Sequence, residues 1–144
     1  DSCRWGVYIS IEKKALLKVG IDIPVPFVEH IGICMLEKSP GKVRLFLESK
    51  SELKNSWGSL HGGVIMTLLD VALASAGRSL DDKCKGAITV ELKTNFISVA
   101  NGTVLAEGRA QRAGKSLIFS EGEVSDRDGV ILAKGTGTFK LIYS

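Results

Sequence analysis

One nearly uninterrupted apolar segment, residues 62–79, constrains this chain of 144 residues more than any other part of it. Aliphatic side chains occupy nearly every side of the helix that the segment predicts, which is typical of a helix enclosed by other structure. Asp70 is the one charged residue between Val64 and Ala76, and burying a carboxylate is costly unless it is paired, neutralised or used. The segment therefore predicts a central helix and marks Asp70 as a candidate for chemistry.

The start of this helix carries a second chemical signal. A polar loop from Asn55 leads into His61-Gly62-Gly63, where the helix is expected to begin. Two glycines at a helix N-terminus leave backbone N–H groups open to an anion. The same glycines would also suit a tight turn and close packing, and the residues alone leave both interpretations open.

The helical positions that share a face with Asp70 carry small side chains. They are Gly63, Thr67, Ala74 and Gly77. Such a strip leaves room for a substrate beside the carboxylate, and it would equally allow close packing against a sheet.

Strand signals fill most of the remaining chain. Alternating apolar and polar residues predict strands at 30–36, 42–50, 88–93, 103–112, 115–125 and 130–141. Short turn signals separate the later strands, which favours an antiparallel meander. We expect an α+β domain over residues 27–144, with one sheet wrapped around the central helix. Residues 1–26 form an N-terminal extension with a short helix at 10–19, followed by an extended connection at Pro24 and Pro26.

Composition excludes several classes of function. The net charge is +3 and charges of both signs are mixed along the chain, so we expect no nucleic-acid partner. The cysteines and histidines are Cys3, Cys34, Cys84, His30 and His61. Their spacing fits no metal site, and an odd cysteine number favours a reduced, cytoplasmic location. The apolar run is too short to span a membrane, and the N-terminus lacks the apolar core of a signal peptide. A targeting segment that was removed stays an open alternative.

The edges of the predicted sheet favour association. A single sheet on one helix leaves two edge strands unpaired, and pairing two protomers edge to edge would protect them. We therefore expect a homodimer.

Several motifs spread along the chain form one recognisable set: Asn55, Gly58, His61-Gly62-Gly63, Leu68-Leu69-Asp70, Thr89 to Phe96, Ala100-Asn101-Gly102 and Arg112 to Ser116. This set resembles the hotdog-fold thioesterases, in the branch of the phenylacetate-pathway and 4-hydroxybenzoyl-CoA enzymes. Val99 stands where members often carry proline. The resemblance spans residues 27–141 and implies a hotdog fold and hydrolysis of an acyl-CoA to a free acid and CoA. It also implies a homodimer or a dimer of dimers (a homotetramer).

The resemblance also implies roles for individual residues. Asp70 would be the nucleophile or the general base, facing the oxyanion donors of the other protomer. The Gly62 N–H would hold the developing oxyanion, and the Asn55 amide would bind the carbonyl or orient water, unless Asn55 only forms a turn. The His61 ring would stabilise the turn before the helix, with direct proton transfer as the less favoured catalytic alternative. The Thr89 hydroxyl would help to place the nucleophile, although threonine is also a common strand residue.

Substrate contacts are expected from Gly63 and Thr67 on the helix and from Arg112 and Lys115 at a hairpin tip. The two cations could pair with the phosphates of CoA, or they could simply be solvated. Coenzyme A would enter only as part of the substrate, without a metal or redox cofactor. Two alternatives stay open: a non-catalytic acyl-CoA-binding sensor, which would gain nothing from Asp70, and a hydroxyacyl-thioester dehydratase, which would need a second acid–base partner.

Overall fold

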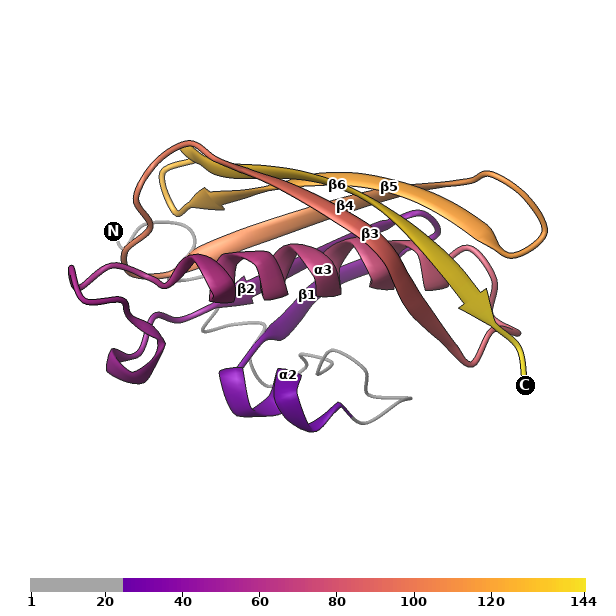
Figure 1. Ribbon diagram of the computed structural model, residues 1–144, viewed down its shortest axis with the longest axis horizontal. Coiled ribbons are helices and arrows are strands. Elements are labelled where there is room, and N and C mark those ends of the chain that lie inside the picture. Colours follow the sequence, from indigo (N-terminus) through magenta and orange to yellow (C-terminus); the bar gives the residue numbers. More distant parts are fainter. Residues whose placement is uncertain (1–24) are drawn as a thin grey trace.

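The computed structural model describes residues 25–144, which form one curved antiparallel sheet with a long helix lying along one of its faces (Figure 1). The elements in chain order are α2 (Pro26–Ile31), β1 (Cys34–Ser39), β2 (Lys42–Leu47), a short 3-10 turn η1 (Ser51–Leu53), α3 (Gly62–Arg78), β3 (Gly86–Phe96), β4 (Val104–Arg112), β5 (Leu117–Asp126) and β6 (Ile131–Ile142). The α+β prediction is confirmed. Across this described part of the chain, no helix has the length and apolar character required to cross a membrane.

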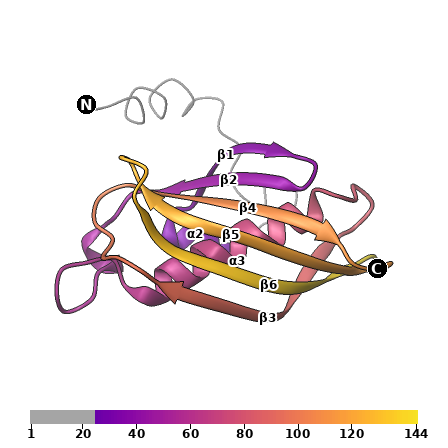
Figure 2. The same cartoon turned by 90° about the horizontal axis from the view of Figure 1, so that it is seen from above.

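The strands are ordered β1-β2-β4-β5-β6-β3, as Figure 2 shows from above. The hairpin β1–β2 and the meander from β4 to β6 agree with the predicted pattern. The predicted meander was wrong for β3, which pairs with β6 and not with its chain neighbour β4. β4 pairs with β2 on one side and with β5 on the other, so it has no side left for β3. β3 therefore lies as an edge strand at the far end of the sheet.

The first described element corrects the prediction of a strand at 30–36. Pro26 stands at the start of α2 instead of in an extended connection, because its fixed φ suits the first helical turn. Val28 and Ile31 are buried by this turn, and Gly32 ends it in the left-handed region with φ 93°. The strand therefore begins only at Cys34. The helix predicted at 10–19 lies outside the described residues.

Helix α3 lies very close to the sheet. A Cβ atom at Gly108 would sit 2.5 Å from the carbonyl oxygen of Ala72, so only glycine lets the helix backbone approach β4 here. The Ser120 hydroxyl donates a 3.0 Å hydrogen bond to the Leu73 carbonyl from the neighbouring strand. These contacts set the height of α3 above the sheet and hence the position of every side chain on its opposite face.

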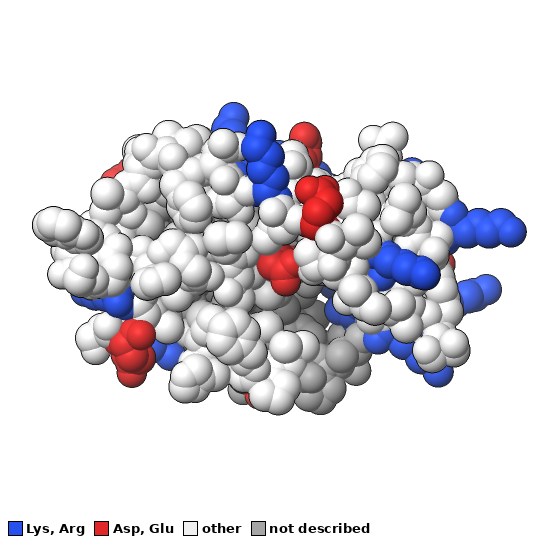
Figure 3. All heavy atoms as spheres, viewed as in Figure 1, with Lys and Arg blue, Asp and Glu red and all other residues white. Residues whose placement is uncertain are grey.

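The expectation that α3 is enclosed on all sides was wrong for the single chain. Its sheet-facing side is buried, including Leu68, Leu69, Ala72 and Leu73. Its opposite side stays open, with Met66 39% exposed. In Figure 3 blue side chains gather at the right of the view, whereas much of the left and centre is white.

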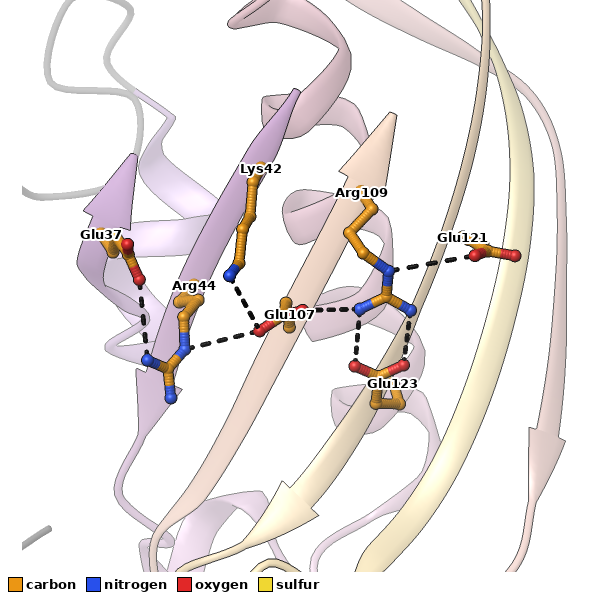
Figure 4. Close-up of polar contacts among 7 residues, drawn as sticks. All are labelled: Glu37, Lys42, Arg44, Glu107, Arg109, Glu121 and Glu123. Atoms are coloured by element: carbon orange, nitrogen blue, oxygen red, sulfur yellow. Dashed lines mark hydrogen bonds and ion pairs between the residues drawn. The ribbon is translucent and has the colours of Figure 1, made fainter. Parts of the chain in front are cut away.

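The outer face of the sheet carries a network of charged side chains centred on Arg109 (Figure 4). Its guanidinium donates two hydrogen bonds to Glu123, at 2.7 and 2.8 Å, and one of 2.7 Å to Glu107. Glu107 and Glu123 are directly opposite each other on β4 and β5, so their charges would repel without Arg109. The hydrogen bonds from Arg109 lower the pKa of Glu123 below its ordinary value.

Replacing Arg109 with Met should lower the free energy of unfolding at pH 7 by about 1–2 kcal/mol, because partly buried carboxylates would lose their counter-charge. A carboxyl group with a lowered folded-state pKa contributes stability above its unfolded-state pKa and loses it as the pH falls through the folded-state value. The difference between native protein and variant should therefore shrink below about pH 4.3. Urea unfolding at pH 7 and at acidic pH would measure it.

Lys42→Met is the matched control, because Lys42 lies opposite Arg109 on β2 but reaches Glu107 only at 3.9 Å. It should cost about 0.5 kcal/mol or less. Equal destabilisation by both variants would contradict a central role for Arg109 in this network.

Candidate functional site

Asp70 lies on the open side of α3, half-buried beside Thr67 and Ala74. The prediction of a small-residue strip holds for these neighbours. It was wrong for Gly77, which faces the sheet, where a Cβ would meet the Ile118 side chain at 2.8 Å. The expectation of a fully buried carboxylate was also wrong for the single chain, since Asp70 is only half-buried among residues 25–144.

The Asp70 carboxylate is held by the strand beside it. The Thr89 hydroxyl donates a 2.7 Å hydrogen bond to Asp70 Oδ1. The pairing of β3 with β6 shifts register between Thr89 and Glu91, a bulge that locally bends the edge strand. Sequence reasoning placed Thr89 near the candidate nucleophile, and the structure shows the two side chains in contact.

An apolar groove of about 490 Å³ opens next to Asp70. It runs between α2, α3 and the start of β3. We call it the α3 groove, and its lining residues are Val25, Phe27, Val28, Met66, Thr67, Asp70, Val71, Ala74, Ser75, Arg78, Gly86, Ala87 and Leu92. The wall from α2 was not predicted, because Pro26 fits an extended connection as well as the first turn of a helix. A carboxylate at the side of an apolar groove can meet the reacting end of a substrate whose apolar part lies in that groove.

The N-terminus of α3 is capped by its own preceding residue. The His61 ring accepts a 2.8 Å hydrogen bond at Nδ1 from the Gly63 N–H. The ring therefore stabilises the turn, as predicted, and Nδ1 is not available as a base in this arrangement. Among residues 25–144, the Gly62 N–H has no hydrogen-bond partner. This donor, with the helix dipole behind it, is suited to an anionic oxygen.

Gly63 and Thr67 also make contact with each other. The Thr67 hydroxyl donates a 2.8 Å hydrogen bond to the Gly63 carbonyl, one helical turn earlier. Thr67 nevertheless lines the α3 groove beside Asp70, whereas Gly63 is exposed at the helix end. A substrate role for Thr67 thus rests on its position in the groove, and a role for Gly63 stays a prediction.

Asn55 shapes the loop before the helix. Its Oδ1 accepts hydrogen bonds from the Trp57 N–H at 2.9 Å and the Ser59 N–H at 3.1 Å, which is a turn-forming use of asparagine. Asn55 and Gly62 also line one shared pocket of about 260 Å³, next to Trp57 and Phe96. Trp57 is 89% exposed although the turn holds its backbone. The structure therefore brings Asn55 and Gly62 together.

Asp70 and Gly62 are not brought together within one chain. They belong to the same helix, and between residues 62 and 70 an α-helix rises about 12 Å. Asp70 lines the α3 groove, whereas Gly62 lines the pocket at the helix start. One carbonyl group cannot touch both within one chain.

Arg112 is engaged by other residues at the far end of the sheet. Its guanidinium donates to Tyr143 Oη at 2.7 Å and to Asp81 Oδ2 at 3.1 Å, and Tyr143 donates to the same carboxylate oxygen. The hydrogen bond from Tyr143 is the main cause of a lowered pKa at Asp81. Lys115 is exposed in the turn that follows β4. The sequence offered no signal for this Asp81–Arg112–Tyr143 cluster, because its members lie far apart in the chain.

No group of three or more His, Cys, Asp or Glu side chains within residues 25–144 is arranged to hold a metal ion. The expected absence of a metal or redox cofactor stays a prediction.

Comparison with known proteins assigns the family. A sequence profile described as the Thioesterase superfamily matches residues 58–133, which include both the His-Gly-Gly turn and Asp70. This chain belongs to the thioesterase superfamily. It is 32% identical over 113 residues to a Saccharolobus solfataricus protein named "Putative esterase", and the match covers 78% of this chain and 79% of that protein. It is 24% identical over 112 residues to acyl-coenzyme A thioesterase 13 of Homo sapiens, covering 76% and 79%.

Solved structures confirm the fold of this thioesterase-superfamily chain. The conserved protein PA5202 from Pseudomonas aeruginosa superimposes with a TM-score of 0.76 at 30% sequence identity. The match covers 83% of this chain and 95% of that one. The predicted hotdog fold, a sheet wrapped around one long helix, is thereby confirmed. The family and its relatives support thioester hydrolysis as the class of reaction.

Proposed function

We propose that this protein is an acyl-CoA thioesterase that hydrolyses an acyl-CoA to a free acid and CoA. The observation that carries the proposal is the Asp70 carboxylate, held by the Thr89 hydroxyl at 2.7 Å beside an apolar groove in a thioesterase-superfamily chain. The similarity to a human protein named for acyl-CoA hydrolysis supports CoA as the thiol portion of the substrate.

The active unit is a homodimer. Because about 12 Å of helix separates Gly62 from Asp70, each complete site needs a second copy whose α3 runs antiparallel to the first. Such a pairing brings Asp70 of one protomer to the Gly62 N–H of the other. The edge strand β3 supports this association, since Ile88 and Val90 are 57% and 59% exposed and its outer side has no partner among residues 25–144.

Two routes use the same carboxylate. Asp70 can attack the thioester carbon directly, after which the C–S bond breaks, CoA leaves as thiolate and water cleaves the mixed anhydride. Alternatively, Asp70 removes a proton from a water molecule that attacks the carbon, and that proton goes on to the leaving sulfur. In either route the carbonyl oxygen becomes negative while the Gly62 N–H donates to it.

Asn55 assists at the same carbonyl. Its Oδ1 is occupied by two backbone N–H groups, which orients the side chain and leaves the amide NH₂ as the group for substrate. The amide would bind the carbonyl oxygen or hold the attacking water. His61 takes no part in proton transfer through Nδ1, since that atom accepts from Gly63. This contact disfavours a dehydratase that shuttles protons through His61.

Lys115 would bind the phosphates of CoA. Arg112 would bind them as well, while it keeps its contacts with Asp81 and Tyr143. Arg112 uses one nitrogen of its guanidinium for these contacts, so its remaining N–H groups are the ones for phosphate.

The direct test is CoA release from a panel of aliphatic and aromatic acyl-CoAs. Turnover of at least one acyl-CoA supports the proposal and identifies the acyl class. Binding of acyl-CoA without turnover of any member of the panel would overturn it in favour of a sensor.

The dimeric site has its own test, because two inactive variants should complement each other. In a heterodimer of Asp70→Asn and Gly62→Pro chains, one of the two sites contains both native residues. Random exchange of equal amounts should therefore restore about a quarter of native activity. Sites built within one chain would restore none.

Replacing Thr89 with Val should lower kcat about tenfold or more with little change in KM. The substitution keeps the side-chain shape but removes the hydrogen bond to Asp70 Oδ1, and such bonds to charged groups are worth about 1.5–3 kcal/mol. Thr89→Ser, which keeps a hydroxyl, is the control and should retain most of the activity. Steady-state kinetics of both variants would measure this, and equal activity of the two would contradict a role for the hydroxyl.

A further inference from the structure

The α3 groove is elongated along the helix. Its α3 residues extend from Met66 to Arg78, a rise of about 18 Å. Asp70 lies one helical turn from Met66, the N-terminal end of this stretch. The longer part of the groove therefore runs from Asp70 toward the C-terminal end of α3.

The lining of this longer part is apolar and small. Val71 and Ala74 form the helix side, and Ala87 of β3 forms the opposite side, whereas Leu92 lies beyond Thr89, on the Met66 side of Asp70. Phe27 of α2 provides an outer wall and is 59% exposed. Methylene groups placed here would be removed from water without displacing any charged group.

The apolar lining ends at Arg78. Between residues 70 and 78 the helix rises about 12 Å, and an extended chain advances about 1.2 Å per bond. The distance therefore corresponds to about ten carbon atoms. A longer chain would bring its methyl end to a guanidinium, where burial of apolar surface gains little.

We propose that the α3 groove binds the acyl group of the substrate and selects straight-chain acyl groups of about eight to ten carbons. This inference rests on the proposed thioesterase function and adds the substrate class to it. A compact aromatic acyl group would fill only the part of the groove beside Asp70 and leave the apolar stretch near Ala74 and Ala87 empty.

The test is kcat/KM across straight-chain acyl-CoAs from butanoyl to hexadecanoyl, with benzoyl-CoA and phenylacetyl-CoA included. We expect a rise of about twofold to fourfold per methylene up to about ten carbons and no further rise beyond. A profile independent of chain length, a continued rise to hexadecanoyl, or a maximum at an aromatic substrate would overturn the inference.

Two variants locate the effect in the groove. Ala74→Leu places a large side chain one turn beyond Asp70, so the ratio of kcat/KM for decanoyl-CoA to that for butanoyl-CoA should fall at least tenfold. Phe27→Ala removes an exposed wall, which cannot disturb the core, and should lower the same ratio severalfold. Lys38→Leu adds a leucine on the exposed part of β1, outside the groove, and should leave the ratio unchanged.

The outcomes separate this inference from the function on which it rests. Absence of turnover with every acyl-CoA would contradict the thioesterase proposal itself. Turnover with an unchanged decanoyl-to-butanoyl ratio in both groove variants would contradict only the assignment of the acyl group to this groove.

Discussion

Asp70→Asn should lower kcat for thioester hydrolysis by at least about a hundredfold while leaving the fold intact. Asparagine has the shape of aspartate and can still accept the Thr89 hydrogen bond through its Oδ1. It can neither attack a thioester effectively nor take a proton from water at neutral pH. The loss should therefore appear in kcat, with KM nearly unchanged.

The measurement is CoA release by native protein and variant, together with thermal unfolding of both. Asp82→Asn is the matched control, because Asp82 is an exposed carboxylate in the loop after α3. It should retain native activity. An Asp70→Asn protein with more than about a tenth of native kcat would exclude Asp70 as nucleophile and as general base.

Gly62→Pro should lower kcat by about a hundredfold to a thousandfold, the loss typical of removing one oxyanion donor. Gly62 is the first residue of α3, a position where proline is favoured and where its missing N–H breaks no helical hydrogen bond. His61, with φ −62° and ψ 138°, already has the extended conformation that a residue before proline prefers. The substitution therefore removes the N–H and little else.

Gly62→Ala separates loss of the N–H from the presence of a side chain. It keeps the donor, and its Cβ would approach the Phe96 ring at 3.4 Å, which is close to ordinary contact. We expect the alanine variant to retain most of the native kcat. Steady-state kinetics and circular dichroism of both variants would decide the matter, and equal losses would refute the N–H assignment.

The elements with strong local patterns were predictable. The helix expected at 62–79 is found at Gly62–Arg78, because glycine at its start and a continuous apolar run leave few alternatives. The strands β4, β5 and β6 lie close to their predicted bounds, because alternation and turn residues are properties of short segments. The turn-stabilising position of the His61 ring was predicted from the family motif.

Features that depend on distant segments were missed or placed wrongly. β3 lies beside β6 because β2 and β5 already pair with both sides of β4, and no local sequence pattern indicates this pairing. The cluster of Asp81, Arg112 and Tyr143 joins residues from three separate parts of the chain. Helix α2 is not predictable from Pro26, because a proline fits both the first helical turn and an extended connection.

The sequence by itself determined the central helix, the antiparallel strands and the residues that carry chemistry, because periodicity and residue type are local. Only the tertiary structure decided which side of α3 is open and that β3 lies beside β6 at the edge of the sheet. The physical reason is that burial and contact depend on which segments pack together, and here on how close Gly108 lets α3 approach the sheet.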